Sequence, residues 1–186
     1  MSVTRAAARR EDALADAVDV LERESAARVY LDGGHSDWLP VAVQAERLRA
    51  AGVARADGFV TNVSNYRRTS DELAYGARLR HLLGDHLEQV VDTSRNGAGP
   101  LGTLWCDPPG RRLGPAPTLR TGETGVAAYL WVNAPGEADG CAAPAGEFVP
   151  ELAVELAGGG TPTSTPTPTP TPTPTSVRPP RAGGAR

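Results

Sequence analysis

Short runs of β-branched and aromatic residues alternate along this chain with segments whose apolar residues recur at helical spacing. In the first such segment Leu14, Val18 and Leu21 share one helical face. Alternation of this kind favours a parallel sheet with helices outside it. Helices are expected at 11–26, 41–51, 71–83 and 150–157, and strands at 28–31, 58–63, 89–92 and 127–132.

Each expected strand is followed by polar side chains and glycine. Asp32 and His35 follow the first strand, Asn62 belongs to the end of the second, Arg95 follows the third, and Asp139 lies in the loop after the fourth. In β/α barrels the C-terminal strand ends and their loops form the active site. We therefore expect these side chains to gather at one end of the sheet, and carboxylates to take part in the chemistry.

Composition and charge exclude several classes of function. A hydrophobic content of 40% supports a core, which we place in residues 11–157. The net charge of −3 argues against a nucleic-acid partner. No run approaches the roughly 20 apolar residues of a membrane span, so no membrane contact is expected. Residues 1–10 lack the apolar segment of a signal peptide and are expected to be a disordered N-terminus.

The composition changes sharply at Gly158. Threonine and proline alternate from Thr161 to Thr175, and proline at every second position removes backbone donors and fixes φ. We expect residues 158–176 to form an extended linker of the kind that joins extracellular catalytic domains to binding modules, and residues 177–186 to form a disordered tail.

The chain has two cysteines, Cys106 and Cys141. Two are too few for a tetrahedral structural zinc site, and they lack CxxC spacing, so no metal is expected. Both lie in loops rich in glycine and proline, which leaves a disulfide between two loops and a pair of free thiols as alternatives. We predict that Cys106 and Cys141 lie within disulfide reach of each other, and such a bond would imply an oxidising compartment.

Five motifs stand out along the chain: Tyr30–Trp38, Thr61–Tyr66, Asp92–Gly97, Trp105–Gly114 and Pro135–Gly140. Their order resembles that of glycoside hydrolase family 6, which comprises bacterial and fungal endoglucanases and cellobiohydrolases. The resemblance covers about residues 11–157. It implies an α/β fold that is the C-terminal portion of a distorted seven-stranded β/α barrel, with about four parallel strands and outer helices.

The same resemblance implies the activity. Family members hydrolyse β-1,4-glucosidic bonds of cellulose with inversion, need no cofactor, and are secreted. The partner is then cellulose or a cello-oligosaccharide, and the full-length form is a monomer. If the start of this chain is genuine, the absence of a signal peptide instead predicts a cytoplasmic or unexpressed protein.

Site residues follow from the resemblance position by position. Asp139 corresponds to the proposed general base, and Arg95 is grouped with it as catalytic. Sugar rings pack their C–H faces on indoles, while carboxylates and amides bind the hydroxyl groups, so a cleft needs both kinds of side chain. The residues assigned to substrate binding are Asp32, His35, Trp38, Asn62, Trp105, Asn133 and Glu137.

The chain departs from the family in three respects. The family's catalytic acid lies upstream of the first motif, in a Glu-Pro-Asp-Ser type of segment that is not found here. Asn133 stands where the family carries lysine, and Asp37 stands where it carries a small residue. An inactive, truncated remnant that at most binds oligosaccharide is therefore the alternative to an active glucanase. An unrelated α/β hydrolase is disfavoured because no G-x-S-x-G elbow occurs.

Local sequence alone permits plainer interpretations. Asp139 precedes a glycine and could be a turn residue, and Arg95 could lie in a surface turn. His35 could be a capping residue. Of the three tryptophans, Trp131 is expected in the core, whereas Trp38 and Trp105 flank loops and are expected to be exposed.

Overall fold

The computed structural model of the protein describes residues 3–24 and 26–158. The expected tail, and the expected linker apart from Gly158, lie outside the described residues. The elements, in chain order, are α1 (Val3–Glu24), β1 (Tyr30–Asp32), α2 (Val41–Ala50), the 3₁₀ turn η1 (Val53–Arg55), β2 (Gly58–Thr61), α3 (Thr69–Leu83), β3 (Glu88–Asp92), β4 (Val126–Leu130) and α4 (Pro150–Leu156).

The four strands form one parallel sheet in the order β1-β2-β3-β4, which confirms the expected α/β class with four parallel strands. Part of the outer edge of β4 is hydrogen-bonded to a loop. Thr118, from the long loop between β3 and β4, exchanges two backbone hydrogen bonds with Tyr129. That loop therefore covers part of an edge that would otherwise be open to pairing.

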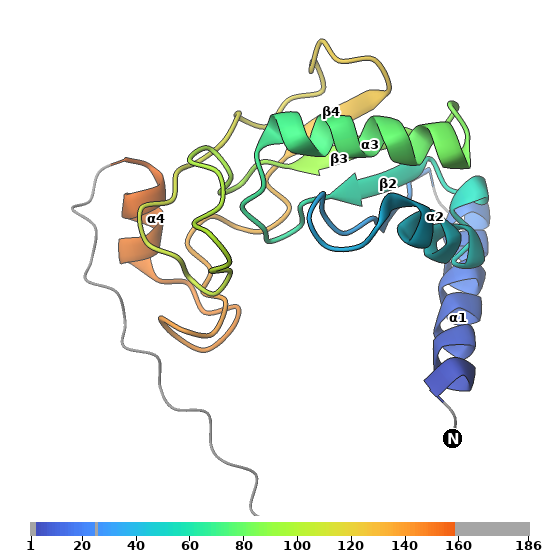
Figure 1. Ribbon diagram of the computed structural model, residues 1–186, viewed down its shortest axis with the longest axis horizontal. Coiled ribbons are helices and arrows are strands. Elements are labelled where there is room, and N and C mark those ends of the chain that lie inside the picture. Colours follow the sequence, from blue (N-terminus) through green and yellow to red (C-terminus); the bar gives the residue numbers. More distant parts are fainter. Residues whose placement is uncertain (1–2, 25, 159–186) are drawn as a thin grey trace, which may run out of the picture.

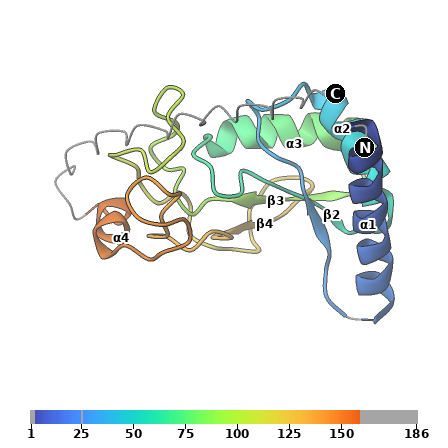
Figure 2. The same cartoon turned by 90° about the horizontal axis from the view of Figure 1, so that it is seen from below.

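The strand register divides the side chains between two faces. Leu31 pairs with Phe59 and points toward α2 and α3, which lie together on one face of the sheet (Figure 2). Phe59 is fully buried there, because helices and strand pack around it. The core consists of Ala45, Leu48, Val53, Phe59, Tyr75, Leu79 and Leu87.

Side chains of the alternate strand positions point to the opposite face of the sheet. There Val60, Val90 and Ala128 lie side by side on neighbouring strands. A hollow of about 480 Å³ lies along this face, with Tyr30 and Leu130 also on its walls. No helix among the described residues packs on this face (Figure 2).

Helix α1 begins at Val3, eight residues before the expected start at 11. The expectation of a disordered stretch over residues 1–10 was therefore wrong for most of it. Alanines 6–8 are the strongest helix formers and no breaker separates them from the amphipathic part, so the helix extends backward. Val18 anchors α1 in the core, and Asp19 pairs with Arg55 of η1. Neither α1 nor any other described helix has the length and apolarity of a membrane span.

The two ends of the sheet differ. Figure 1 shows α1 beside the end where the strands begin, and the long loops after β3 and β4, together with α4, at the end toward which β2 points. Since all strands are parallel, this second end collects every carboxyl-terminal loop. We call it the rim.

Candidate active site

Four of the five side chains expected at one end of the sheet lie at or after the strand ends at the rim, and the fifth, His35, lies in the loop after β1. Asp32 is the last residue of β1, Asn62 directly follows β2, Arg95 lies in the turn after β3, and Asp139 lies in the loop after β4. Arg95 and Asp139 form an ion pair, with 2.6 Å between Nη2 and Oδ1. The strand ends therefore bring the proposed base and its expected neighbour together.

The carboxylate of Asp139 is bound on both oxygens. Oδ1 pairs with Arg95, and Oδ2 accepts hydrogen bonds from the Tyr66 hydroxyl at 3.0 Å and the Asp107 backbone N–H at 3.1 Å. The Asp139 side chain is 12% exposed and that of Arg95 only 3%. Such a carboxylate has a fixed orientation while keeping limited contact with solvent.

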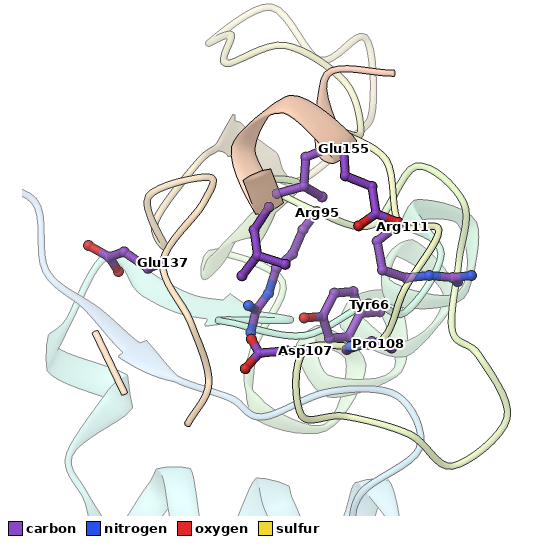
Figure 3. A pocket seen from close by; sticks show the side chains of 9 residues that line it. Tyr66, Arg95, Asp107, Pro108, Arg111, Glu137 and Glu155 are labelled. Carbon is purple, nitrogen blue, oxygen red and sulfur yellow. The ribbon is translucent and has the colours of Figure 1, made fainter. Parts of the chain in front are cut away.

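Tyr66 and Arg95 also pack on each other. The guanidinium carbon lies 4.5 Å from the centre of the Tyr66 ring, a cation–π contact away from bulk water. Burial raises the pKa of Tyr66, and the neighbouring Asp139 carboxylate raises it further, while Arg95 lowers it. Tyr66 therefore stays a neutral hydrogen-bond donor. Figure 3 shows the Tyr66 hydroxyl, Arg95 and Asp107 turned toward one another.

A cavity of about 20 Å³ adjoins this group, with Tyr66, Arg95, Asp107 and Glu137 on its walls. The volume suffices for one water molecule, which needs roughly 10–15 Å³ by this measure. Nε of Arg95 is buried without a hydrogen-bond partner in the described part of the chain. A water in the cavity would supply one.

Asp107 organises the loop that contains Asp139. Its Oδ1 accepts the backbone N–H of Asp139 at 2.7 Å, and its Oδ2 accepts those of Cys141 at 2.9 Å and Ala142 at 2.8 Å. The adjacent Cys106 is bonded to Cys141, with 5.8 Å between the Cα atoms, as expected from the sequence. A carboxylate and a disulfide thus join the same two loops. Because both sulfurs are bonded to each other, Cys106, Asp107 and Cys141 do not form a metal site as they stand.

Asp92, the last residue of β3, has a similar role at the centre of the rim. It is 1% exposed, and its carboxylate accepts the backbone N–H groups of Ser64, Ser94 and Asn133. These come from the loops after three different strands, β2, β3 and β4. Asp92 therefore fixes the loops relative to one another.

Asn62 was expected to contact sugar at the rim, and this assignment was wrong. It is 0% exposed, and its amide donates to the carbonyl of Asp92 at 2.8 Å and accepts from the N–H of Arg67 at 3.0 Å. Its backbone has a φ of 68°, a conformation that asparagine tolerates better than most residues. Asn62 turns the chain at the end of β2 and faces inward.

Two tryptophans lie open on the surface, as expected. Trp38 is 59% exposed and Trp105 is 64% exposed. His35 stacks on Trp38, with 6.0 Å between ring centres. Burial and the nearby Arg67 lower the pKa of His35, so the imidazole is held in its neutral form. Asp32, beside them, is exposed and accepts the N–H of Gly34.

Trp131 differs from its expected place in the core. It follows the end of β4, is half-buried, and donates its indole N–H to the carbonyl of Pro115. The strand ends at Leu130, two residues earlier than expected, so the ring lies against a loop and not inside the sheet.

Asn133 and Glu137 are at the rim but do not contact Asp139. Asn133 accepts a hydrogen bond from the Ser64 hydroxyl at 3.0 Å. The Glu137 carboxylate makes no hydrogen bond or ion pair with another described side chain, and Figure 3 shows it pointing away from Tyr66 and Arg95. The Asn133 amide is thus hydrogen-bonded to Ser64 and to the Ala134 carbonyl, whereas the Glu137 carboxylate is available to a ligand.

Sequence analysis missed Tyr66, Asp92 and Asp107 as members of the site. Each lies inside a motif, but their roles depend on loops 28 to 73 positions apart. One local signal was available for Asp107, which directly follows a cysteine expected to form a disulfide.

Residues 2–160 match the family described as glycosyl hydrolases family 6. The chain belongs to this family. The match includes every element of the described fold and every residue of the rim, and it confirms the resemblance on which the site residues were assigned.

Individual relatives are similar to this chain over most of its length. Endoglucanase A of Thermobispora bispora is 53% identical over 135 residues, covering 72% of this chain and 30% of the relative. Endoglucanase 1 of Streptomyces sp. (strain KSM-9) is 53% identical over 147 residues, covering 78% of this chain and 40% of the relative. The chain thus spans well under half the length of these curated relatives.

Solved structures show the same relation. The endoglucanase Cel6 from Mycobacterium tuberculosis, solved in complex with a thio-linked cellobioside, superposes with a TM-score of 0.77 at 45% identity, covering 81% of this chain and 53% of that one. Cellobiohydrolase II of Humicola insolens, solved with glucose and cellotetraose, gives a TM-score of 0.72 at 26% identity, covering 82% and 56%.

Proposed function

We propose that this chain forms the general-base side of a β-1,4-glucan hydrolase site in which Asp139 activates the attacking water. The supporting observation is the way the Asp139 carboxylate is bound. Arg95, Tyr66 and the Asp107 N–H occupy three acceptor positions, and a carboxylate offers about four. One position on Oδ1 is left, and a water bound there would be oriented by a carboxylate that cannot rotate.

The proposed reaction inverts the anomeric centre. An inverting glycosidase needs a second carboxyl group about 6.5–9.5 Å from the base, to protonate the leaving oxygen. Asp92 and Asp107 are the buried aspartates at the rim, but each already accepts three backbone N–H groups. A protonated carboxyl group accepts fewer and weaker hydrogen bonds, so protonating either would weaken these contacts. We assign the acid to neither, and place it outside the described residues.

Sugar binding is proposed for the exposed aromatic rings. Trp38 and Trp105 offer indole faces to solvent, and the neutral His35 and the exposed Asp32 beside Trp38 offer hydrogen-bonding groups. This combination suits a glucose chain, whose rings are apolar above and below and polar at the equator. The disulfide supports an extracellular location, since such bonds persist in oxidising compartments.

The base can be tested apart from the acid. Fluoride leaves a sugar with little help from an acid, so β-cellobiosyl fluoride reports on the base alone. We expect the full chain to release fluoride and to form the α-anomer of cellobiose, seen by proton NMR. Asp139→Asn should abolish the release, while Asp85→Asn, at an exposed position before β3, should not. Equal rates in the two variants would refute the assignment of Asp139.

A second function is oligosaccharide binding without turnover. The exposure of Trp38 and Trp105 favours it, because stacking of sugar on these rings needs no catalytic acid. Titration calorimetry with cellotetraose distinguishes the two proposals. Binding that is unchanged in Asp139→Asn, together with no fluoride release from the unmutated chain, would support the binding protein over the hydrolase.

A further inference from the structure

The loop 33–38 presents both Trp38 and His35 at the rim. Its first residues are attached to β2 by backbone hydrogen bonds, from the N–H of Gly33 to Val60 at 2.7 Å and from the N–H of Asn62 to Gly34 at 2.8 Å. The later part of the loop, where Trp38 lies, has no such ladder. What fixes it must come from side chains.

Helix α3 supplies two of these side chains from below. The Tyr75 hydroxyl donates to the carbonyl of Gly33 at 3.0 Å, and Oε1 of Glu72 accepts the N–H of Ser36 at 2.8 Å. Ser36 lies within the turn that the N–H of Trp38 closes onto the carbonyl of His35 at 3.2 Å. The bond to Glu72 therefore holds the turn that joins the two aromatic rings.

A buried glutamate at position 72 is energetically unfavourable. Its side chain is 0% exposed, and Oε2 has no hydrogen-bond partner among the residues described. Burial raises the pKa of Glu72, against the lowering effects of the Ser36 N–H and of the Ser36 and Thr61 hydroxyl groups. An uncompensated carboxyl group in a core is unfavourable, and an apolar side chain would fill the same space more easily. The hydrogen bond to the loop is the contact that an apolar residue could not make.

The outer side of the loop is held more weakly. Asp37 pairs with Arg67 at 2.7 Å, but the Asp37 side chain is 70% exposed. Exposed pairs of this kind contribute little. Trp38 also packs over Gly34, since a Cβ atom built there would lie 2.5 Å from the indole. The ring thus follows the loop backbone closely.

We propose that Glu72 is a positioning residue for the rim, which sets the orientation of Trp38 by holding the N–H of Ser36. Its importance for ligand binding rests on the proposed function, in which sugar packs on Trp38. The effect of Glu72 on the loop does not rest on the proposed function, because the hydrogen bond to Ser36 forms without ligand.

Two near-isosteric variants of the full chain test the proposal. Glu72→Gln keeps a carbonyl acceptor for Ser36, whereas Glu72→Met fills the volume with no acceptor. Each is prepared with 5-fluorotryptophan, and Trp38→Phe identifies the Trp38 fluorine resonance. We expect Glu72→Met to shift or broaden the Trp38 resonance alone, and Glu72→Gln to leave it as in the unmutated chain. Cellotetraose should then bind about fivefold more weakly to Glu72→Met, which is the equivalent of one hydrogen bond.

Other outcomes would overturn the proposal. An unchanged Trp38 resonance in Glu72→Met would show that Glu72 does not position the ring. Equal changes at Trp38, Trp105 and Trp131 would show a general loosening. If Glu72→Met does not fold, Ser36→Pro removes the same hydrogen bond from the half-buried loop and is judged by the same resonance. If the unmutated chain does not bind cellotetraose, the proposed function fails. The fluorine spectra would still test whether Glu72 positions Trp38, because they need no ligand.

Discussion

The Tyr66 hydroxyl donates a hydrogen bond to Oδ2 of Asp139 at 3.0 Å, although the two residues are 73 positions apart in the chain. The same Tyr66 ring supports the guanidinium of Arg95, which binds the other oxygen. One tyrosine therefore restrains both the carboxylate and its counter-ion. This arrangement gives the proposed base a single orientation before any substrate arrives.

Removing the hydroxyl with Tyr66→Phe should lower the free energy of unfolding by about 1–3 kcal/mol, because a hydrogen bond to a charged group is lost in a buried place. Urea denaturation measures it. Tyr129→Phe is the matched control, since Tyr129 is also buried and its hydroxyl makes no hydrogen bond within the described residues. Equal losses in the two variants would show that ring packing, and not the bond to Asp139, sets the effect.

Asp107→Asn should destabilise the loop that contains Asp139. One of the two carboxylate oxygens that accept backbone N–H groups is replaced by an NH₂ group. This NH₂ donor then faces a backbone N–H donor, and no hydrogen bond can form between them. We expect a loss of about 1–3 kcal/mol in unfolding free energy, together with faster amide exchange at Cys141 and Ala142. Asp85→Asn provides the same chemical change at an exposed site. Protected amides in Asp107→Asn would contradict the assigned role.

Reduction of the disulfide should lower stability by about 3–4 kcal/mol, the loop-closure entropy for a separation of 35 residues. The Asp107 carboxylate would still join the two loops. We therefore expect the chain to unfold at lower urea after reduction, with its near-ultraviolet circular dichroism preserved in buffer. Loss of that signal on reduction alone would show that the carboxylate is insufficient.

Stability should depend on pH through Glu72. Burial, with a smaller contribution from Asp71, raises its pKa above the ordinary 4.5. The folded chain then keeps the proton after the unfolded chain has lost it, so stability falls as pH rises from 4.5 through the folded pKa. Glu72→Gln has no proton to lose and should gain stability relative to the unmutated chain over that window. Parallel pH profiles in urea would contradict this.

Gly34→Ala separates a steric effect from backbone strain. Gly34 has a φ of +69°, and an added Cβ would lie 2.5 Å from the Trp38 ring. Gly102, with a φ of +57°, has no atom within 4 Å of such a Cβ. Both substitutions should cost about 1–2 kcal/mol from strain, but only Gly34→Ala should displace Trp38 and weaken cellotetraose binding. Equal binding by the two variants would show that the ring moves aside without consequence.

The sheet could be predicted from sequence because each strand and helix has its own local pattern. The run Gly58–Thr61 is β-branched and aromatic, and Thr69–Leu83 has a helical stripe, so order and class follow from short segments. The disulfide was also within reach, since only two cysteines exist.

The rim could be predicted only in part. Asp139 and Arg95 were assigned by resemblance and do lie together. Asn62 was assigned to substrate contact by the same resemblance, and nothing local reveals that the Asp92 carbonyl lies close enough to bind it. The same applies to Glu72, whose position in a helical stripe predicts neither complete burial nor a contact with a loop 36 positions away. Contacts between loops depend on how the strands bring them together.

The carboxylate of Asp92 joins Ser64 to Asn133, and the Ser64 hydroxyl binds Asn133 directly. Because the two side chains bind each other, the energetic effects of substitutions at these two positions should not add. A change of Asn133 toward the lysine typical of the family would then act differently depending on the residue at position 64. Positions 64 and 133 therefore behave as one unit, and the effect of a substitution at one of them is defined only together with the residue at the other.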